Sequence, residues 1–272
     1  MQGNCMNRLS LPFKGRVRVG MGLKGETMDT KRHTSKQYET ELQEVKESLL
    51  YLGALTQQAI EDSIRALLDR DTGLARKVIA NDAFIDKLDG EVEEKCIRLL
   101  ALRQPAARDL RFITTAIKIN GHLERIGDMA VKICEKVALL NEEAQLKPYI
   151  DLPRMAEIAR GMIRKSLDAL VKEDVALANE VRREDEAVDS LNEQIFRELL
   201  TFMMEDPRTI HRSLLIMQIS KTVERISDHA KGIADMVVFM ITGKNVRHQW
   251  PFDEEEAIRP GGRKQVKPSQ IQ

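Results

Sequence analysis

The chain has 272 residues, and its 43 basic side chains are balanced by 43 acidic ones, so the formal net charge is zero. This length suits one large or two medium domains, and the balanced charge argues against a dedicated nucleic-acid binder. Hydrophobic residues make up 42% of the chain but aromatic residues only 4%, a composition that favours long helices over sheets. No apolar run approaches the roughly 18 residues of a membrane span, so we expect no insertion into a membrane.

The first 35 residues differ in composition from the rest of the chain. They are rich in Gly, Arg and Lys and show no helical periodicity, so we predict a disordered N-terminal extension over residues 1–35. They also lack the apolar segment of a signal peptide. We favour Met28 as the start of the natural protein over a functional basic arm that includes the residues before it.

After this extension the sequence predicts six helices, in chain order over residues 35–69, 74–102, 107–140, 151–172, 175–204 and 207–243. Helix breakers such as Pro105 lie between consecutive stretches. Asp151 and Asp206 are the expected N-caps of the fourth and sixth helices. Gly243 ends the last helix, and we predict a disordered, polar C-terminal tail over residues 244–272.

The three cysteines, Cys5, Cys96 and Cys134, match no zinc-ligand spacing. Cys96 and Cys134 fall near apolar positions of predicted helices, where a thiol behaves as a small buried hydrophobe. An odd number of scattered cysteines fits a reducing compartment, so we expect a cytoplasmic protein with free thiols.

The two halves of the chain repeat one another. Many residues of the first two helices in each half are identical to those 103 positions away. In the third helices the separation is 100, as between Ile119 and Ile219, because one loop is shorter in the second half. Such a repeat indicates a duplicated structural unit. We therefore predict an all-α fold of two tandem three-helix bundles, 36–145 and 151–243, related by an internal pseudo-twofold axis.

The last helix of each half carries the same acidic signature. It reads Glu124-Arg125-Ile126-Gly127-Asp128 in the first half and Glu224-Arg225-Ile226-Ser227-Asp228 in the second. A helix turns by about 100° per residue, so carboxylates four residues apart share one face. The same face is expected to include Glu135 in the first half and Asp235 in the second.

The middle helix of each half bears a second acidic stripe. Its carboxylates are Asp82 and Asp86, followed by Asp89 and Glu93, in the first half and Asp185 and Asp189 in the second. Like charges at this spacing repel by a few tenths of a kcal/mol per pair, a cost that a bound cation would remove. Because oxygen ligands suit hard cations, we predict divalent or trivalent metal ions (Mg, Mn or Fe) at Glu124, Asp128, Asp82, Asp86, Glu224, Asp228, Asp185 and Asp189.

The alternative to metal sites is a pair of solvated acidic faces with salt bridges. Lys132 is placed to pair with Asp128, and Lys221 lies three residues before Glu224. Asn192 stands where the first half has Asp89, so the second site is expected to bind metal more weakly.

Nothing in the sequence is organised for catalysis. His122, His211 and His229 form no Glu-x-x-His pair, the motif of ferritin-like di-iron proteins. There is no phosphate-binding Gly-rich loop and no G-x-S-x-G motif. A metal-dependent enzyme is therefore the least favoured function, and we expect no enzymatic activity.

Ordered motifs in both halves are similar to those of a known family. In the first half they are Arg103-Gln104-Pro105, Asp109-Leu110-Arg111 and Leu123-Glu124-Arg125-Ile126-Gly127-Asp128. In the second they are Met203-Met204-Glu205-Asp206 with Arg208-Thr209-Ile210, Val223-Glu224-Arg225-Ile226 and Val246-Arg247-His248. Through these motifs the chain resembles, over about residues 36–248, the PhoU family of accessory and regulatory proteins of the phosphate-specific transport system.

The resemblance implies two three-helix bundles in a cytoplasmic homodimer that is peripheral to the inner membrane through its partners. It implies a negative regulator of the phosphate-starvation response and a modulator of phosphate uptake. Such a protein would act as an adaptor between the ATPase subunit (PstB) of the phosphate ABC transporter and a sensor histidine kinase (PhoR). Family members can carry metal ions on the repeated E/D-x-x-x-D motif, here Glu124 to Asp128 and Glu224 to Asp228. The competing function is a helical scaffold whose acidic faces bind partner proteins without metal.

Overall fold

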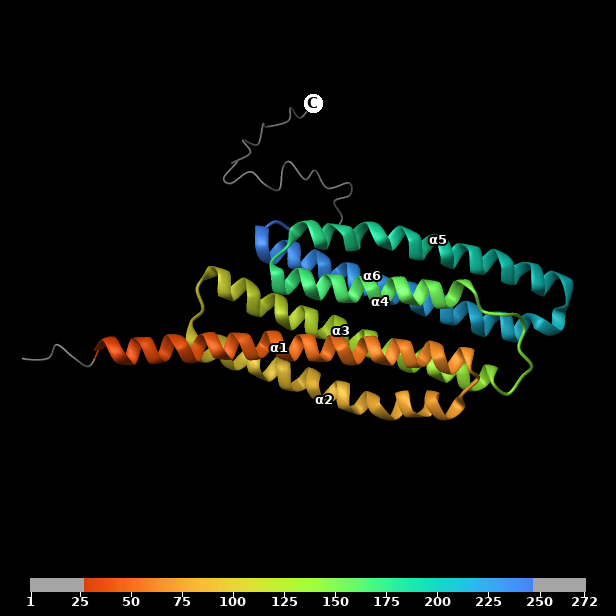
Figure 1. The fold of residues 1–272 in the computed structure, drawn as a ribbon, viewed down its shortest axis with the longest axis horizontal. Coiled ribbons are helices and arrows are strands. Elements are labelled where there is room, and N and C mark those ends of the chain that lie inside the picture. The colour runs from red at the N-terminus through yellow and green to blue at the C-terminus, as the bar shows by residue number, and fades with distance from the viewer. Residues whose placement is uncertain (1–26, 247–272) are drawn as a thin grey trace, which may run out of the picture. The chain divides into compact units, whose positions relative to one another are not determined.

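The computed structural model describes the backbone of residues 27–246 and the side chains of residues 36–246 (Figure 1). This part of the chain is helical and contains no strand. Its elements are α1 (Thr27–Leu68), α2 (Thr72–Arg103), α3 (Ala107–Leu140), α4 (Asp151–Lys172), α5 (Val175–Glu205), the 3-10 turn η1 (Pro207–Thr209) and α6 (Ile210–Thr242). The start of α1, up to Glu39, is a unit of its own, and the packing described below belongs to the unit that begins at Thr40.

The helix boundaries agree with the sequence prediction except at the start of α1. That helix begins at Thr27 rather than at Ser35. No Gly or Pro lies between these two positions, so the backbone can stay helical beyond the point where the apolar periodicity ends. The disorder predicted for residues 1–35 therefore does not hold for its helical last part. The rest of that prediction, and nearly all of the predicted tail 244–272, lies outside the described residues.

Aspartates begin several of the helices. Asp206 caps η1 as predicted, while Asp71 and Asp174 cap α2 and α5 at equivalent places of the two halves. Asp151 is not the N-cap that we predicted, because that place is taken by Ile150 and Asp151 lies in the first turn of α4. A carboxylate in the first turn is still stabilised by the positive end of the helix dipole.

The core follows the two apolar seams of α3 and α6. Every seam residue is buried: Ala116, Ile119, Leu123, Ile126, Ala130, Ile133, Val137 and Leu140 on α3, and Ile216, Ile219, Val223, Ile226, Ala230, Ile233, Val237 and Met240 on α6. The two helices also pack against each other, so they join the bundle of α1, α2 and α3 to the bundle of α4, α5 and α6 (Figure 1). Burial on this scale supplies the main free energy that stabilises such bundles. Among the described helices, none is long and apolar enough to cross a membrane.

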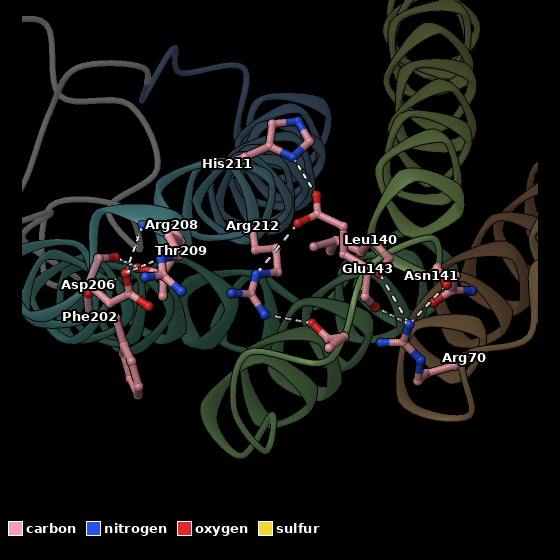
Figure 2. Close-up of polar contacts among 11 residues, drawn as sticks. Arg70, Leu140, Asn141, Glu143, Phe202, Asp206, Arg208, Thr209, His211 and Arg212 are labelled. Atoms are coloured by element: carbon pink, nitrogen blue, oxygen red, sulfur yellow. Dashed lines mark hydrogen bonds and ion pairs between the residues drawn. The ribbon is translucent and has the colours of Figure 1, made fainter.

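The linker between the two bundles is held by charged side chains (Figure 2). Arg70 donates hydrogen bonds to the carbonyls of Leu140, Asn141 and Glu143, at 3.3, 3.0 and 2.5 Å. The Glu143 carboxylate lies 2.6 Å from His211 Nδ1 and 3.6 Å from Arg212 Nε. The linker is thus tied to the α1–α2 turn on one side and to α6 on the other, which fixes the chain where it crosses between bundles.

Candidate functional site

The predicted acidic residues of the first half meet between α2 and α3. Asp82 and Asp86 come from α2, and Glu124 and Asp128 come from α3. We call these four residues, together with Asp89 of α2, the first acidic cluster. Asn120 of α3 holds Asp89 through hydrogen bonds from its amide to the Asp89 carboxylate (2.6 Å) and carbonyl (2.9 Å).

Burial and mutual repulsion raise carboxyl pKa values in this cluster. The pKa of Asp82 is raised first by desolvation and then by the charges of Asp86 and Asp128. Desolvation likewise raises the pKa of Glu124, with smaller contributions from Asp128, Asp89 and Asp86. A raised pKa contributes stability only while the group is protonated, below the unfolded-state pKa, and this is lost as pH rises through the folded pKa. At neutral pH the ionised cluster therefore destabilises the fold, and a bound cation would offset this.

The second half brings together Asp185 and Asp189 of α5 with Glu224 and Asp228 of α6, which we call the second acidic cluster. Two lysines lie within it. Lys231 Nζ is 2.5 Å from Asp185 Oδ2, and the Asp185 side chain is only 4% exposed. A second ammonium, that of Lys221, lies 2.7 Å from Glu224 Oε1. Desolvation still raises the pKa values of Asp189 and Asp228.

The two clusters therefore differ in where their counter-charge comes from. The position equivalent to Lys231 is Val131 in the first half, which has no such lysine. Its carboxylates form an ion pair with Lys132, whose Nζ lies 3.8 Å from Asp128 Oδ2 with both side chains about half-exposed. Exposed ion pairs of this kind contribute little. Charge is thus compensated from within in the second cluster and only weakly in the first.

The sequence did not reveal the partner of Asp235. We predicted that Asp235 shares the acidic face of Glu224 and Asp228, and the structure buries its carboxylate in the second bundle. There its Oδ1 lies 3.0 Å from Arg182 Nε, with the two side chains 11% and 3% exposed. Seven residues turn a helix through almost two full turns, so Asp235 stays on the same side of α6 as Asp228. What the sequence did not reveal is its ion pair with Arg182 of α5. Lys231 was also missed, although comparing the halves at Val131 would have revealed it.

The first cluster has the oxygen donors that a hard cation prefers. In the second, the lysines already hold two of the carboxylates. Among residues 36–246, no three His, Cys, Asp or Glu side chains lie close enough together to hold one metal ion as they stand. Carboxylate side chains would have to rotate toward one another to coordinate an ion in either cluster.

Comparison with known proteins decides the family. The PhoU domain matches the chain twice, over residues 49–137 and 152–237, which are the two bundles. The chain belongs to the PhoU family. Its fold and the repeat predicted from the sequence are those of a PhoU protein, and the family consists of accessory regulatory proteins rather than enzymes.

Several relatives align over most of the chain. The phosphate-specific transport system accessory protein PhoU homolog of Pseudomonas putida is 40% identical over 217 residues, 79% of this chain and 85% of that protein. The homolog of Aquifex aeolicus is 41% identical over 209 residues, 77% of this chain and 95% of that protein.

Solved PhoU structures have the same fold. PhoU from Pseudomonas aeruginosa aligns with a TM-score of 0.73 and 38% identity, covering 76% of this chain and all of that structure. The phosphate transport system regulatory protein PhoU from Streptococcus pneumoniae aligns with a TM-score of 0.72 and 29% identity over 77% of this chain and 99% of that structure. This PhoU chain is therefore an accessory, regulatory component of phosphate transport.

Proposed function

We propose that this PhoU protein is a cytoplasmic adaptor between the ATPase subunit of the phosphate ABC transporter and a sensor histidine kinase. In that role it restrains phosphate uptake and keeps the phosphate-starvation response low while phosphate is plentiful. The observation that carries the proposal is the double PhoU match over both bundles. Family membership also supports a homodimer that is peripheral to the inner membrane through its partners and binds no nucleic acid.

The pairing of the two bundles supports an adaptor. Two similar bundles sit side by side through α3 and α6, and each presents an acidic cluster between its second and third helices. A protein with two related faces can contact two partners at once. Electrostatic complementarity sets the rate and specificity of such contacts more than their strength.

Co-purification with tagged protein tests this proposal. We expect the transporter's ATPase subunit and the kinase to be retained with the tagged protein from cells grown in high phosphate, and retained differently from cells grown in low phosphate. A variant with reversed charges on the exposed face of the first cluster, Asp86→Lys with Asp128→Lys, should lose at least one partner. The matched control is Glu94→Lys, which changes an exposed charge of α2 that pairs with Arg98 away from the cluster. Recovery of neither partner under either condition would exclude the adaptor role.

We also propose that the first acidic cluster holds a metal ion, with Asp86, Glu124 and Asp128 as ligands and Asp82 and Asp89 at its edges. Its raised carboxyl pKa values and its lack of an internal lysine support this assignment. A hard cation there would neutralise the cluster and so stabilise the contact between α2 and α3. The second cluster, with Asp185, Asp189, Glu224 and Asp228, is the weaker candidate because Lys231 and Lys221 already neutralise part of its charge.

Metal stoichiometry tests the assignment. We expect protein purified without chelator to have one high-affinity site per chain for Mg²⁺, Mn²⁺ or iron. Elemental analysis and calorimetry measure the bound ion and its affinity. The double variant Asp86→Asn with Asp128→Asn should lose this ion and yet be more stable than the wild type in chelator, because i,i+4 repulsion is removed. The variant Asp189→Asn with Asp228→Asn is the matched control and should keep the ion. No binding at millimolar metal would favour the alternative, a scaffold whose acidic faces bind proteins directly.

A further inference from the structure

A cavity of about 230 Å³ lies in the first bundle between α1, α2 and α3. Apolar residues such as Val78, Ile85 and Val131 form much of its wall. Two carboxylates, Asp62 and Asp82, also line it, and none of its lining residues is basic. A cavity of ~150 Å³ already admits a benzene-sized molecule, so this one has room for a short aliphatic chain.

The second bundle fills the equivalent place with a side chain of its own. Asp185 is the counterpart of Asp82 at the repeat separation of the first two helices, and Lys231 is the counterpart of Val131 at that of the third helices. The Lys231 ammonium lies 2.5 Å from the Asp185 carboxylate. The repeat itself thus shows an occupant for this position: an ammonium group at the end of an aliphatic chain.

Other differences between the halves open the cavity in the first. Ala59 stands where the second half has the fully buried Met162, and Asp62 stands where it has Lys165. An added Cβ at Gly127 would lie 3.1 Å from Ile85 and would narrow the space beside Asp82. In the second bundle these larger and basic side chains fill the equivalent space. The first bundle lacks both their volume and their positive charge.

We propose that this cavity binds a primary alkylammonium group, with the aliphatic chain along its apolar wall and the ammonium on Asp82. An ammonium has three hydrogen-bond donors and is strongly attracted to a carboxylate that is partly removed from water. The source is either the lysine side chain of a partner protein or a free diamine, since both present the same group. This site shares Asp82 with the edge of the first acidic cluster. It differs from the metal site in its apolar wall, which offers no ligands to a metal ion.

The charge around Asp82 supports the need for a cation. Asp86 and Asp128 add to its negative field, and the nearest lysine, Lys132, is engaged with Asp128 and is half-exposed. Asp62 has an ion pair with Arg65 at 2.8 Å, so its charge is partly compensated along the same helix. Asp82 is therefore the carboxylate that a ligand would contact.

Titration of the full chain with n-butylammonium in buffer that contains a chelator tests the proposal. We expect one molecule to bind per chain and to raise the melting temperature, and n-butanol, its neutral counterpart, to bind at least about tenfold more weakly. Asp82→Asn should weaken n-butylammonium binding about tenfold or more. Asp86→Asn, a change in the metal cluster outside the cavity, should weaken binding less than Asp82→Asn does, because it removes a neighbouring charge and not the carboxylate that contacts the ammonium.

Val131→Lys provides the second arm, because it copies the second bundle. This variant should no longer bind n-butylammonium and should melt at a higher temperature than the wild type, and adding Asp82→Asn should reverse the gain. Competition by a lysine blocked at both backbone ends would assign the cavity to a partner's side chain, whereas competition by 1,5-diaminopentane alone would assign it to a free diamine. Equal binding of n-butanol, or unchanged binding by Asp82→Asn, would overturn the proposal.

Discussion

Replacing Arg182 by Met is expected to lower the free energy of unfolding by about 3–5 kcal/mol, because it removes one partner of a buried ion pair. The Arg182 and Asp235 side chains are 3% and 11% exposed, and the Arg182 guanidinium also lies 3.3 Å from Asn179 Oδ1. The carboxylate of Asp235 would keep its desolvation penalty and lose its guanidinium. Urea unfolding measured by circular dichroism gives the change directly.

Two further variants separate the ion pair from simple loss of packing. Arg182→Met combined with Asp235→Leu should recover most of the stability, since a buried pair can often be replaced by apolar residues at little cost. Arg197→Met, which breaks an exposed pair on the same helix, should cost no more than about 0.5 kcal/mol. If Arg182→Met cost no more than Arg197→Met, the buried pair would not be a stabilising contact.

Replacing Lys231 by Met is the second large effect that we expect, a loss of about 2 kcal/mol at neutral pH. It falls below the range for a fully buried pair because the Lys231 side chain is 39% exposed, although that of Asp185 is only 4% exposed. Asp185→Asn should rescue most of the loss, because the variant then no longer buries a lone carboxylate. Thermal unfolding of the two single variants and the double variant measures the coupling.

Lys221→Met is the matched control for this second prediction. Its ammonium also contacts a carboxylate of the second cluster, but the Lys221 side chain is 60% exposed. The expected cost is about 0.5 kcal/mol or less. Equal effects of Lys231→Met and Lys221→Met would mean that the internal lysine does not neutralise the cluster.

Much of the fold could be predicted because it depends on repeated local patterns. Apolar residues recur at helical spacing from Ala116 to Leu140 and again from Ile216 to Met240, and these apolar residues are buried in both helices. The acidic signatures lie on the same face as the partners predicted on the preceding helices. Helix periodicity fixes which residues of one helix share a face, because only three or four residues separate neighbouring turns.

The features that the sequence did not reveal are contacts between residues far apart in the chain. Asp235 is directed by Arg182, which is more than 50 residues away and belongs to another helix. Lys231 lies on α6 and its partner Asp185 lies on α5. The periodicity of one helix cannot predict such a contact between two helices. The start of α1 was misjudged for a different reason, since a helix can continue without an apolar stripe where no residue breaks it.

The two clusters also illustrate how a duplicated unit can diverge. Both halves keep the carboxylates, but the first half has the neutral Val131 where the second has Lys231. This difference decides whether a lysine of the same bundle neutralises part of the cluster's charge. The carboxylates of the first cluster can therefore bind a cation from solution or from a partner, whereas Lys231 already occupies this place in the second cluster. Different partners or ligands on the two bundles would follow from that difference.

Expression of a phosphate-starvation reporter in a strain that lacks this gene tests the regulatory role most directly. We expect the reporter to be switched on in phosphate-replete medium and stored phosphate to rise, and both effects to disappear when the sensor kinase is also deleted. Complementation with the wild-type gene should restore repression. Unchanged reporter expression in the deletion strain with phosphate plentiful would contradict the account, because a regulator that restrains the response cannot be removed without releasing it.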